Sequence, residues 1–280
     1  MPTAEMPNAD PILVVENIVK RFETQDGVLT AVDDVSFSVA PGEFLSVIGP
    51  SGCGKSTLFN VMGGLLDGYD GRVSVAGETV RGPHPSIGMI FQEESTFPWR
   101  TVIDNVAFPL EIAGMPKAER IERGRHFINL VGLNGFERRY PAELSGGMRQ
   151  RVSMARTLAS EPKILLMDEP FAALDEQTRL LLGDKVLQIQ QELKQTTLLI
   201  THNLTEAVQL SDRILVMTYR PGRTKRIVEI KLPRPRTSEI VSSEDFGHYV
   251  AQIWGDLREE ATKGLKDDEA RMQRAGDKHP

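Results

Sequence analysis

Short, uninterrupted apolar runs recur along this chain and indicate the strands of a buried sheet. They occupy residues 44–48, 163–167, 197–201 and 213–217. A strand that helices cover on both faces has no solvent side, so its sequence does not alternate, and such runs are typical of a parallel sheet. Helical segments at 178–194 and 204–210 separate the later runs. The pattern predicts an α/β core.

Three other segments alternate between apolar and polar positions, as half-buried strands do. They cover residues 12–19, 34–39 and 71–77, and they lie on both sides of the run at 44–48. Alternation means that one face of the strand meets the core and the other meets water. These segments predict a separate antiparallel β-subdomain that packs on the core.

The segment from about 97 to 160 has a helical character and interrupts the α/β pattern. Residues at helical spacing lie there between a proline and a glycine, which are helix boundary signals: Ile121, Arg125, Ile128 and Val131. We predict an α-helical subdomain at about 97–160, inserted in a domain that spans residues 12–220. Residues 221–280 are expected to form a C-terminal extension with a short strand and a helix.

Composition narrows the function classes. A net charge of −6 and a pI near 5.5 argue against a general nucleic-acid binder, which should be basic. A single cysteine allows no disulfide within the chain and fits a reducing compartment. The first ten residues contain no apolar stretch, and no window approaches the ~18–20 apolar residues of a spanning helix. Any membrane role is therefore expected to depend on a partner.

A glycine-rich segment follows the run at 44–48 and precedes a predicted helix. Its residues are Gly49, Pro50, Ser51, Gly52, Cys53, Gly54, Lys55, Ser56 and Thr57. A glycine, four residues and then Gly-Lys-Ser is the phosphate-binding P-loop pattern, and the strand–turn–helix context argues against an ordinary tight turn. Backbone N–H groups and the helix N-terminus hold a polyphosphate, while Lys55 reaches the β- and γ-phosphates and Ser56 can ligate Mg²⁺. The P-loop amides would tend to lower the thiol pKa of Cys53. The simpler interpretation is a small residue that fits the loop, and we assign Cys53 no catalytic role.

Two acids end the run at 163–167, where a buried parallel strand would open beside the P-loop. A carboxylate from Asp168 can hold Mg²⁺, mostly through water. Glu169 follows it and is the candidate to polarise the water that attacks the γ-phosphate. The alternative, a capped strand end with surface acids, does not explain why the pair accompanies a P-loop.

Three further features are ambiguous when each is taken alone. Ser145, Gly146 and Gly147 start a helix and form a second anion-binding N-terminus, or simply a glycine-rich helix start. His202, just past a strand, can hydrogen-bond a γ-phosphate, although a lone histidine is more often structural. Phe22 can stack on adenine, although an isolated phenylalanine usually belongs to the core.

The segment from Leu144 to Gln150 closely resembles the signature motif of ATP-binding-cassette (ABC) ATPases, with Met148 where many members have glutamine. The family's other landmarks follow in its order across residues 12–220. The resemblance implies the following assignments: Phe22 as the adenine-stacking aromatic, Gln92 as the Q-loop residue at the metal and water, Asp168-Glu169 as Walker B, Leu174-Asp175 as the D-loop, and His202 as the switch histidine. It implies a P-loop NTPase (RecA-like) core that uses ATP and Mg²⁺. It also implies a head-to-tail homodimer in which each ATP lies between one P-loop and the other chain's signature motif.

Within this family, the chain is similar to the ATPase subunits of importers for nitrate, sulfonates such as taurine, and related solutes. The similarity lies in residues 91–94, 97–102, 105–107, 219–223 and 232–236. It implies transmembrane permease subunits, an extracytoplasmic solute-binding protein that selects the solute, and a location at the cytoplasmic face of the cell membrane. We expect Trp99 and Arg100 to form the surface that receives the permease, rather than to fill the helical subdomain.

Other classes with a P-loop fit less well. A cassette ATPase of DNA repair would be expected to carry zinc cysteines, a coiled-coil insertion or a basic surface, and this acidic chain has a single cysteine. A ribosome-associated cassette protein would carry two cassettes. A GTPase would need a guanine-reading Asn-Lys-x-Asp motif, which this sequence does not contain. A purely structural P-loop protein would lack the pair of Glu169 and His202, which this sequence has.

Overall fold

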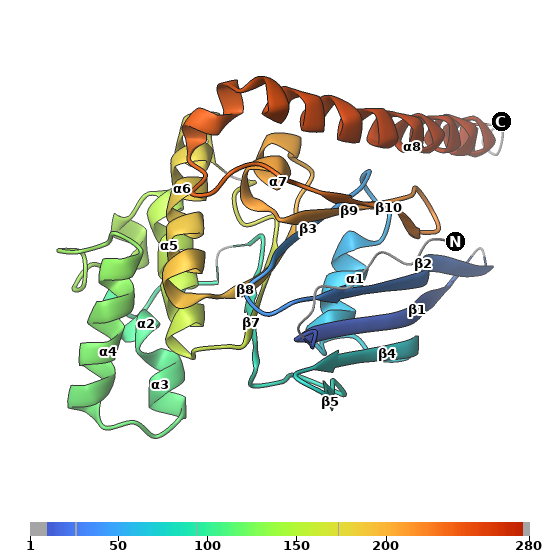
Figure 1. Cartoon of the computed structure of the whole chain (residues 1–280). Helices are drawn as coiled ribbons and strands as arrows, with labels where there is room; N and C mark the ends of the chain where they lie inside the picture. Colours follow the sequence, from blue (N-terminus) through green and yellow to red (C-terminus); the bar gives the residue numbers. More distant parts are fainter. Residues whose placement is uncertain (1–9, 26, 94, 173, 277–280) are drawn as a thin grey trace.

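The apolar runs form a six-stranded sheet at the centre of the molecule (Figure 1). The computed structural model describes residues 10–25, 27–93, 95–172 and 174–276. In spatial order the strands are β10 (Thr224–Glu229), β9 (Arg213–Met217), β3 (Phe44–Ile48), β8 (Thr196–Ile200), β7 (Ile164–Asp168) and β6 (Ile87–Ile90). All neighbouring pairs are parallel except β10 and β9. β3 and β8 are buried at every position. The predicted parallel core is therefore confirmed.

An antiparallel sheet lies beside this core, with the order β2-β1-β4-β5. Its strands are β1 (Leu13–Thr24), β2 (Gly27–Val39), β4 (Asp70–Val75) and β5 (Glu78–Thr79). Val15, Val35 and Val73 from this sheet share one apolar cluster with Leu58 and Phe59 of the helix α1 (Lys55–Met62). The sheet thus helps to fix the helix that follows the P-loop, and the predicted antiparallel subdomain is confirmed.

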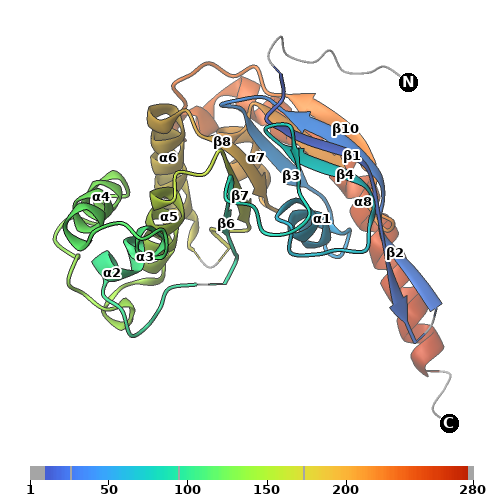
Figure 2. The ribbon, with the colours of Figure 1, turned by 90° about the horizontal axis from the view of Figure 1, so that it is seen from below.

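The helices of the segment 97–160 form a lobe on the opposite side of the core from β1 and β2 (Figure 2). They are α2 (Val102–Val106), α3 (Phe108–Ile112), α4 (Lys117–Leu130), the 3₁₀ turn η1 (Pro141–Glu143) and α5 (Gly146–Ala159). Ile128 of α4 and Val152 of α5 belong to one cluster with Leu182 of α6 (Glu176–Leu193). The predicted helical subdomain is confirmed, while the exact domain boundaries stay a prediction.

The C-terminal extension packs on the core instead of forming a core of its own. It contains β10, the 3₁₀ turn η2 (Ser238–Ser242) and the long helix α8 (Glu244–Gly276). Phe246 and Ile253 of α8 share a cluster with Val216 of β9 and with Ala207 of α7 (Leu204–Leu210). In the described residues, no helix has both the length and the apolar character to cross a membrane.

One strand of the core sheet, β6, was not predicted. It has four residues, and Gly88 breaks its apolar run. A Cβ at this position would lie 2.7 Å from side-chain atoms of both Pro162 and Thr157, so only glycine lets the strand approach this closely. The glycine that hides the strand in the sequence is thus what allows it to pack.

The segment 232–236, which marked the importer resemblance, attaches the extension to the core. Arg234 pairs with Asp212, whose other carboxylate oxygen accepts from the N–H of Phe44 at the start of the P-loop strand. Arg236 is buried and donates to the carbonyls of Ser211 and Ile230 at 2.5 and 2.9 Å. Burial lowers the pKa of Arg236 to about 10. These arginines therefore have a structural task.

Candidate nucleotide site

The P-loop connects the end of β3 to the start of α1 in a backbone path that requires glycine. Gly52 and Gly54 have φ of +71° and +99°, in the left-handed region that favours glycine. A Cβ on Gly54 would also lie 2.7 Å from the carbonyl oxygen of Ala31 in β2. The Lys55 Nζ donates to the carbonyls of Gly49 and Pro50, at 2.8 and 3.0 Å. The lysine is therefore folded back onto the loop.

A cavity of about 380 Å³ opens over this loop. Eight of the predicted site residues line it: Phe22, Ser51, Gly52, Gly54, Lys55, Ser56, Thr57 and Glu169. The structure thus brings Phe22 of β1 to the cavity over the P-loop, which is where an aromatic ring that stacks on adenine would have to lie. Three residues that were not predicted also line the cavity: Leu29, Ala31 and Arg220.

Asp168 stands at the end of β7 and meets the P-loop helix. Its carboxylate is hydrogen-bonded by the Ser56 side chain, and burial raises its pKa. Its Oδ1 is buried and has no hydrogen-bond partner among the described residues. An unpartnered carboxylate oxygen beside a hydroxyl is a donor set of hard oxygen atoms, which is what Mg²⁺ prefers. The residues present therefore fit this ion.

Glu169 lines this cavity and contacts His202, which does not line it. Glu169 has φ of +44°, an uncommon conformation for this residue type, and its N–H donates to the carbonyl of Ile200 in β8 at 2.8 Å. Its Oε2 lies 3.0 Å from the Nδ1 of His202, which follows β8. The carboxylate is 19% exposed and the imidazole 59%, so both remain accessible to water. Two neighbouring strand ends thus bring a carboxylate and a histidine together.

Two predicted features differ from the expectation. Burial raises the pKa of the Cys53 thiol, and this outweighs the lowering effect of Lys55, so the predicted fall in pKa is wrong. The Cys53 side chain is fully buried and belongs to the apolar cluster that includes Leu58 and Phe59 of α1. Gln92 is exposed after β6 and does not line the cavity over the P-loop.

The signature segment lies at a second cavity of about 670 Å³. Ser145 caps α5 by accepting from the N–H of Met148 at 3.4 Å. Ser145, Gly146 and Gly147 line this cavity together with Asp175, which in turn caps α6. The two cavities share no lining residue. A ligand in one of them therefore leaves the other helix start free.

This fold and site define a class of protein. A parallel sheet with a P-loop after a central strand, and an Asp-Glu pair at the end of a strand nearby, constitute a P-loop NTPase. The antiparallel sheet and the helical lobe distinguish this chain from a minimal member of that class.

Comparisons with known proteins give the family. The family described as "ABC transporter" matches residues 32–172. An ABC transporter ATP-binding protein of Methanocaldococcus jannaschii is 50% identical over 254 residues, 91% of this chain and 94% of that protein. The chain belongs to the ABC transporter family, and it is an ATPase that binds and hydrolyses ATP.

Two further relatives carry transport names. The aliphatic sulfonates import ATP-binding protein SsuB of Bacillus cereus is 39% identical, over 85% of this chain and 94% of its own length. The nitrate transport protein NasD of Klebsiella oxytoca is 42% identical, over 86% and 94%. The predicted resemblance to nitrate and sulfonate importer ATPases is therefore confirmed.

Solved structures support the same family. A dimeric ATP-binding cassette in a post-hydrolysis state with ADP and Pi has a TM-score of 0.68 and 30% identity, and covers 79% of this chain and 100% of that chain. The cbiO1 protein of Clostridium perfringens, part of the ABC transporter complex cbiONQ, has a TM-score of 0.72 and 26% identity, over 86% and 94%.

Proposed function

We propose that this protein is the ATP-hydrolysing subunit of an importer for a small anionic or organic solute of the nitrate, sulfonate or taurine class. Its similarity to SsuB and NasD supports the class of solute. The observation that carries the enzymatic part is the position of Glu169, which lines the P-loop cavity and lies 3.0 Å from His202. The solute itself is selected by the permease and by an extracytoplasmic solute-binding protein, which acts on this subunit only indirectly.

Hydrolysis is assigned to the residues around the cavity over the P-loop. Lys55 exchanges its two carbonyl acceptors for oxygens of the β- and γ-phosphates. Ser56 and Asp168 would hold Mg²⁺, and Gln92 would join them only by moving toward the cavity that it does not line in this structure. The ion would neutralise phosphate charge. Glu169 accepts the proton of the attacking water, and His202 hydrogen-bonds the γ-phosphate.

Two copies of the chain are needed to complete the site. The helix start at Ser145 and the P-loop line different cavities, so one nucleotide does not contact both within a chain. The similar dimeric cassette with bound ADP and Pi supports pairing of two subunits. We infer a head-to-tail homodimer in which Ser145, Gly146 and Gly147 of each copy contact the ATP held by the other P-loop.

The turn around Trp99 is the proposed docking surface for the permease. Asn105 is fully buried; its side chain accepts from the N–H of Phe97 and donates to the carbonyls of Phe97, Arg100 and Thr101, at 2.8–3.1 Å. This network fixes the turn, yet Trp99 remains 73% exposed. A rigid exposed aromatic beside an arginine is typical of an interface anchor. Docking there would hold the protein at the cytoplasmic face of the membrane as a peripheral subunit.

The test is uptake by vesicles that contain this subunit assembled with its permease. ATP-dependent entry of labelled nitrate or taurine, with saturating solute-binding protein outside, is the expected result. The Lys55→Ala variant should assemble but not support uptake. A wild-type complex that hydrolyses ATP and takes up neither these anions nor other sulfonates would contradict the proposed solute class.

A further inference from the structure

The turn between β9 and β10 closes one side of the nucleotide cavity. Gly222 exchanges two backbone hydrogen bonds with β2: its N–H donates to the carbonyl of Ala31 at 3.0 Å, and its carbonyl accepts from the N–H of Asp33 at 2.9 Å. A Cβ on Gly222 would lie 2.0 Å from the carbonyl oxygen of Cys53 in the P-loop. Glycine is required here because the turn rests directly on the P-loop backbone.

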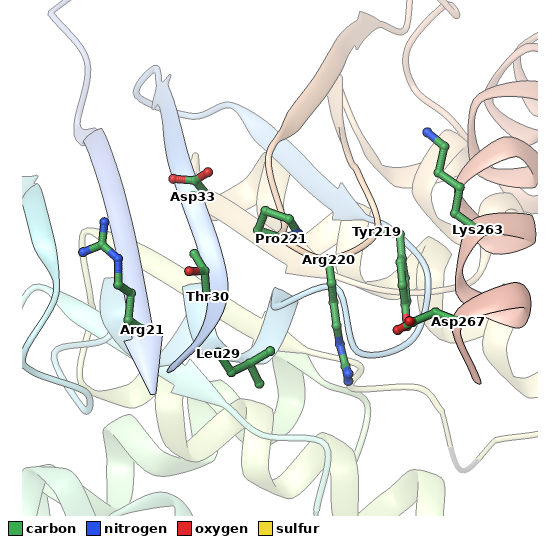
Figure 3. A pocket seen from close by; sticks show the side chains of 9 residues that line it. All are labelled: Arg21, Leu29, Thr30, Asp33, Tyr219, Arg220, Pro221, Lys263 and Asp267. Carbon is green, nitrogen blue, oxygen red and sulfur yellow. The ribbon is translucent and has the colours of Figure 1, made fainter. Parts of the chain in front are cut away.

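Arg220 extends from this turn onto the P-loop. Its Nε donates to the carbonyl of Gly52 at 2.9 Å, and its Nη2 lies 2.6 Å from where a Cβ of Gly52 would be. The side chain lines the nucleotide cavity and also a neighbouring cavity of about 640 Å³, where Figure 3 shows it between Leu29 and Tyr219. Arg220 forms no salt bridge with any residue that the structure describes.

The C-terminal helix holds the turn from the other side. The N–H of Tyr219 donates to Oε2 of Glu260 at 2.9 Å, and the Tyr219 hydroxyl lies 3.2 Å from Oδ2 of Asp267. Glu260 is only 2% exposed and also pairs with Lys225 of β10. Figure 3 shows Tyr219 next to α8, with Lys263 and Asp267 on that helix. A buried acid therefore fixes the residue that precedes Arg220.

We propose that Arg220 binds the polyphosphate of the nucleotide in its own chain's P-loop. The inference rests on the proposed nucleotide site. With Nε bonded to the Gly52 carbonyl, the two Nη groups are left to donate to phosphate oxygens, and a guanidinium pairs well with phosphate. The cation stands at the one loop where several phosphate charges must be held, and no described acid neutralises it.

The experiment measures binding of a fluorescent ADP analogue, labelled on the ribose, to monomeric full-length protein. Arg220→Ala should raise the Kd about 10-fold, because a charge-assisted hydrogen bond is lost, and Arg220→Lys should recover part of the affinity. Arg223→Ala is the matched control: Arg223 lies in the same turn, pairs with Asp33 and lines neither cavity. Its Kd should equal that of the wild type. The matching GDP analogue should lose affinity by the same factor in Arg220→Ala, because the contact is to phosphate.

Several results would overturn the inference. One is an Arg220→Ala variant that binds the ADP analogue with the wild-type Kd while Lys55→Ala loses binding. This result would count against the inference whether or not Arg220→Ala also impairs the ATP-induced pairing of two subunits. Another is an equal loss in Arg223→Ala, which would assign the effect to the fold of the turn. A loss confined to the ADP analogue would mean a contact to the base. If the wild type bound no analogue at all, the proposed nucleotide site itself would be wrong.

Discussion

Replacing Glu169 by glutamine tests the proposed role of this side chain as the acceptor of the proton from water. The two side chains have nearly the same size, and the backbone at this position is held by the N–H bond to Ile200. The amide can still hydrogen-bond His202, 3.0 Å away, but it cannot accept a proton from water. Lys55 and the P-loop amides are not changed, so ATP binding should be retained.

General-base catalysis contributes ~10²–10⁴-fold, which corresponds to about 2.7–5.4 kcal/mol of barrier. We therefore expect Glu169→Gln to lower the steady-state ATPase rate by at least ~10²-fold, while the Kd for ATP stays near that of the wild type. Phosphate release and analogue binding measure the two quantities. Glu229→Gln, at an exposed acid on β10 paired with Lys231, removes the same charge elsewhere and should leave both unchanged. A Glu169→Gln enzyme with nearly normal turnover would refute the assignment of the base.

The remaining predictions concern the docking turn and a buried acid. Trp99→Ala should keep its fold and its basal ATPase activity, because the side chain is 73% exposed, but it should lose permease assembly or solute-stimulated turnover. The control Trp254→Ala, on α8, should keep permease assembly and solute-stimulated turnover. Normal transport by Trp99→Ala would show that Trp99 only packs on Phe97. Burial raises the pKa of Glu206 to about 7, above its unfolded value, so its contribution to stability is full below about pH 4.5 and is lost as the pH rises through 7. Glu206→Gln should therefore flatten the fall of Tm between pH 5 and 8, which an unchanged pH dependence would contradict.

Much of the fold could be predicted because its strongest signals are local. β3, β9 and α7 have the bounds that their apolar patterns predicted. For the two strands, the reason is that a strand covered on both faces appears in the sequence as one continuous apolar run, whose ends mark the ends of the strand. β1 extends to Thr24, five residues beyond the predicted strand. Residues 20–24 are mostly polar, and they form a strand by pairing with β2. The sequence of this segment does not alternate between apolar and polar residues, so it does not predict this pairing.

The site divides in the same way. The P-loop and the Asp168-Glu169 pair depend on short-range spacing, which the sequence displays directly. The contact of Arg220 with Gly52 joins residues 168 positions apart, so it depends on a turn fixed by β2 and α8. The direction of the Cys53 side chain is decided by packing, which spacing does not encode. Residues 219–223 contribute to the importer resemblance in the sequence, whereas the position of Arg220 at the P-loop cavity depends on the fold.

The central claim, that two chains enclose ATP between P-loop and signature motif, is tested most directly by the mass of the ATP-bound protein. Light scattering of Glu169→Gln with ATP and Mg²⁺ should give twice the chain mass of 31.1 kDa, and without ATP the chain mass. Adding Ser145→Arg places a cation and a bulky side chain at the helix start that must meet the partner's ATP, so this double variant should stay monomeric while still binding nucleotide. An ATP-dependent dimer that persists in the double variant would contradict the account.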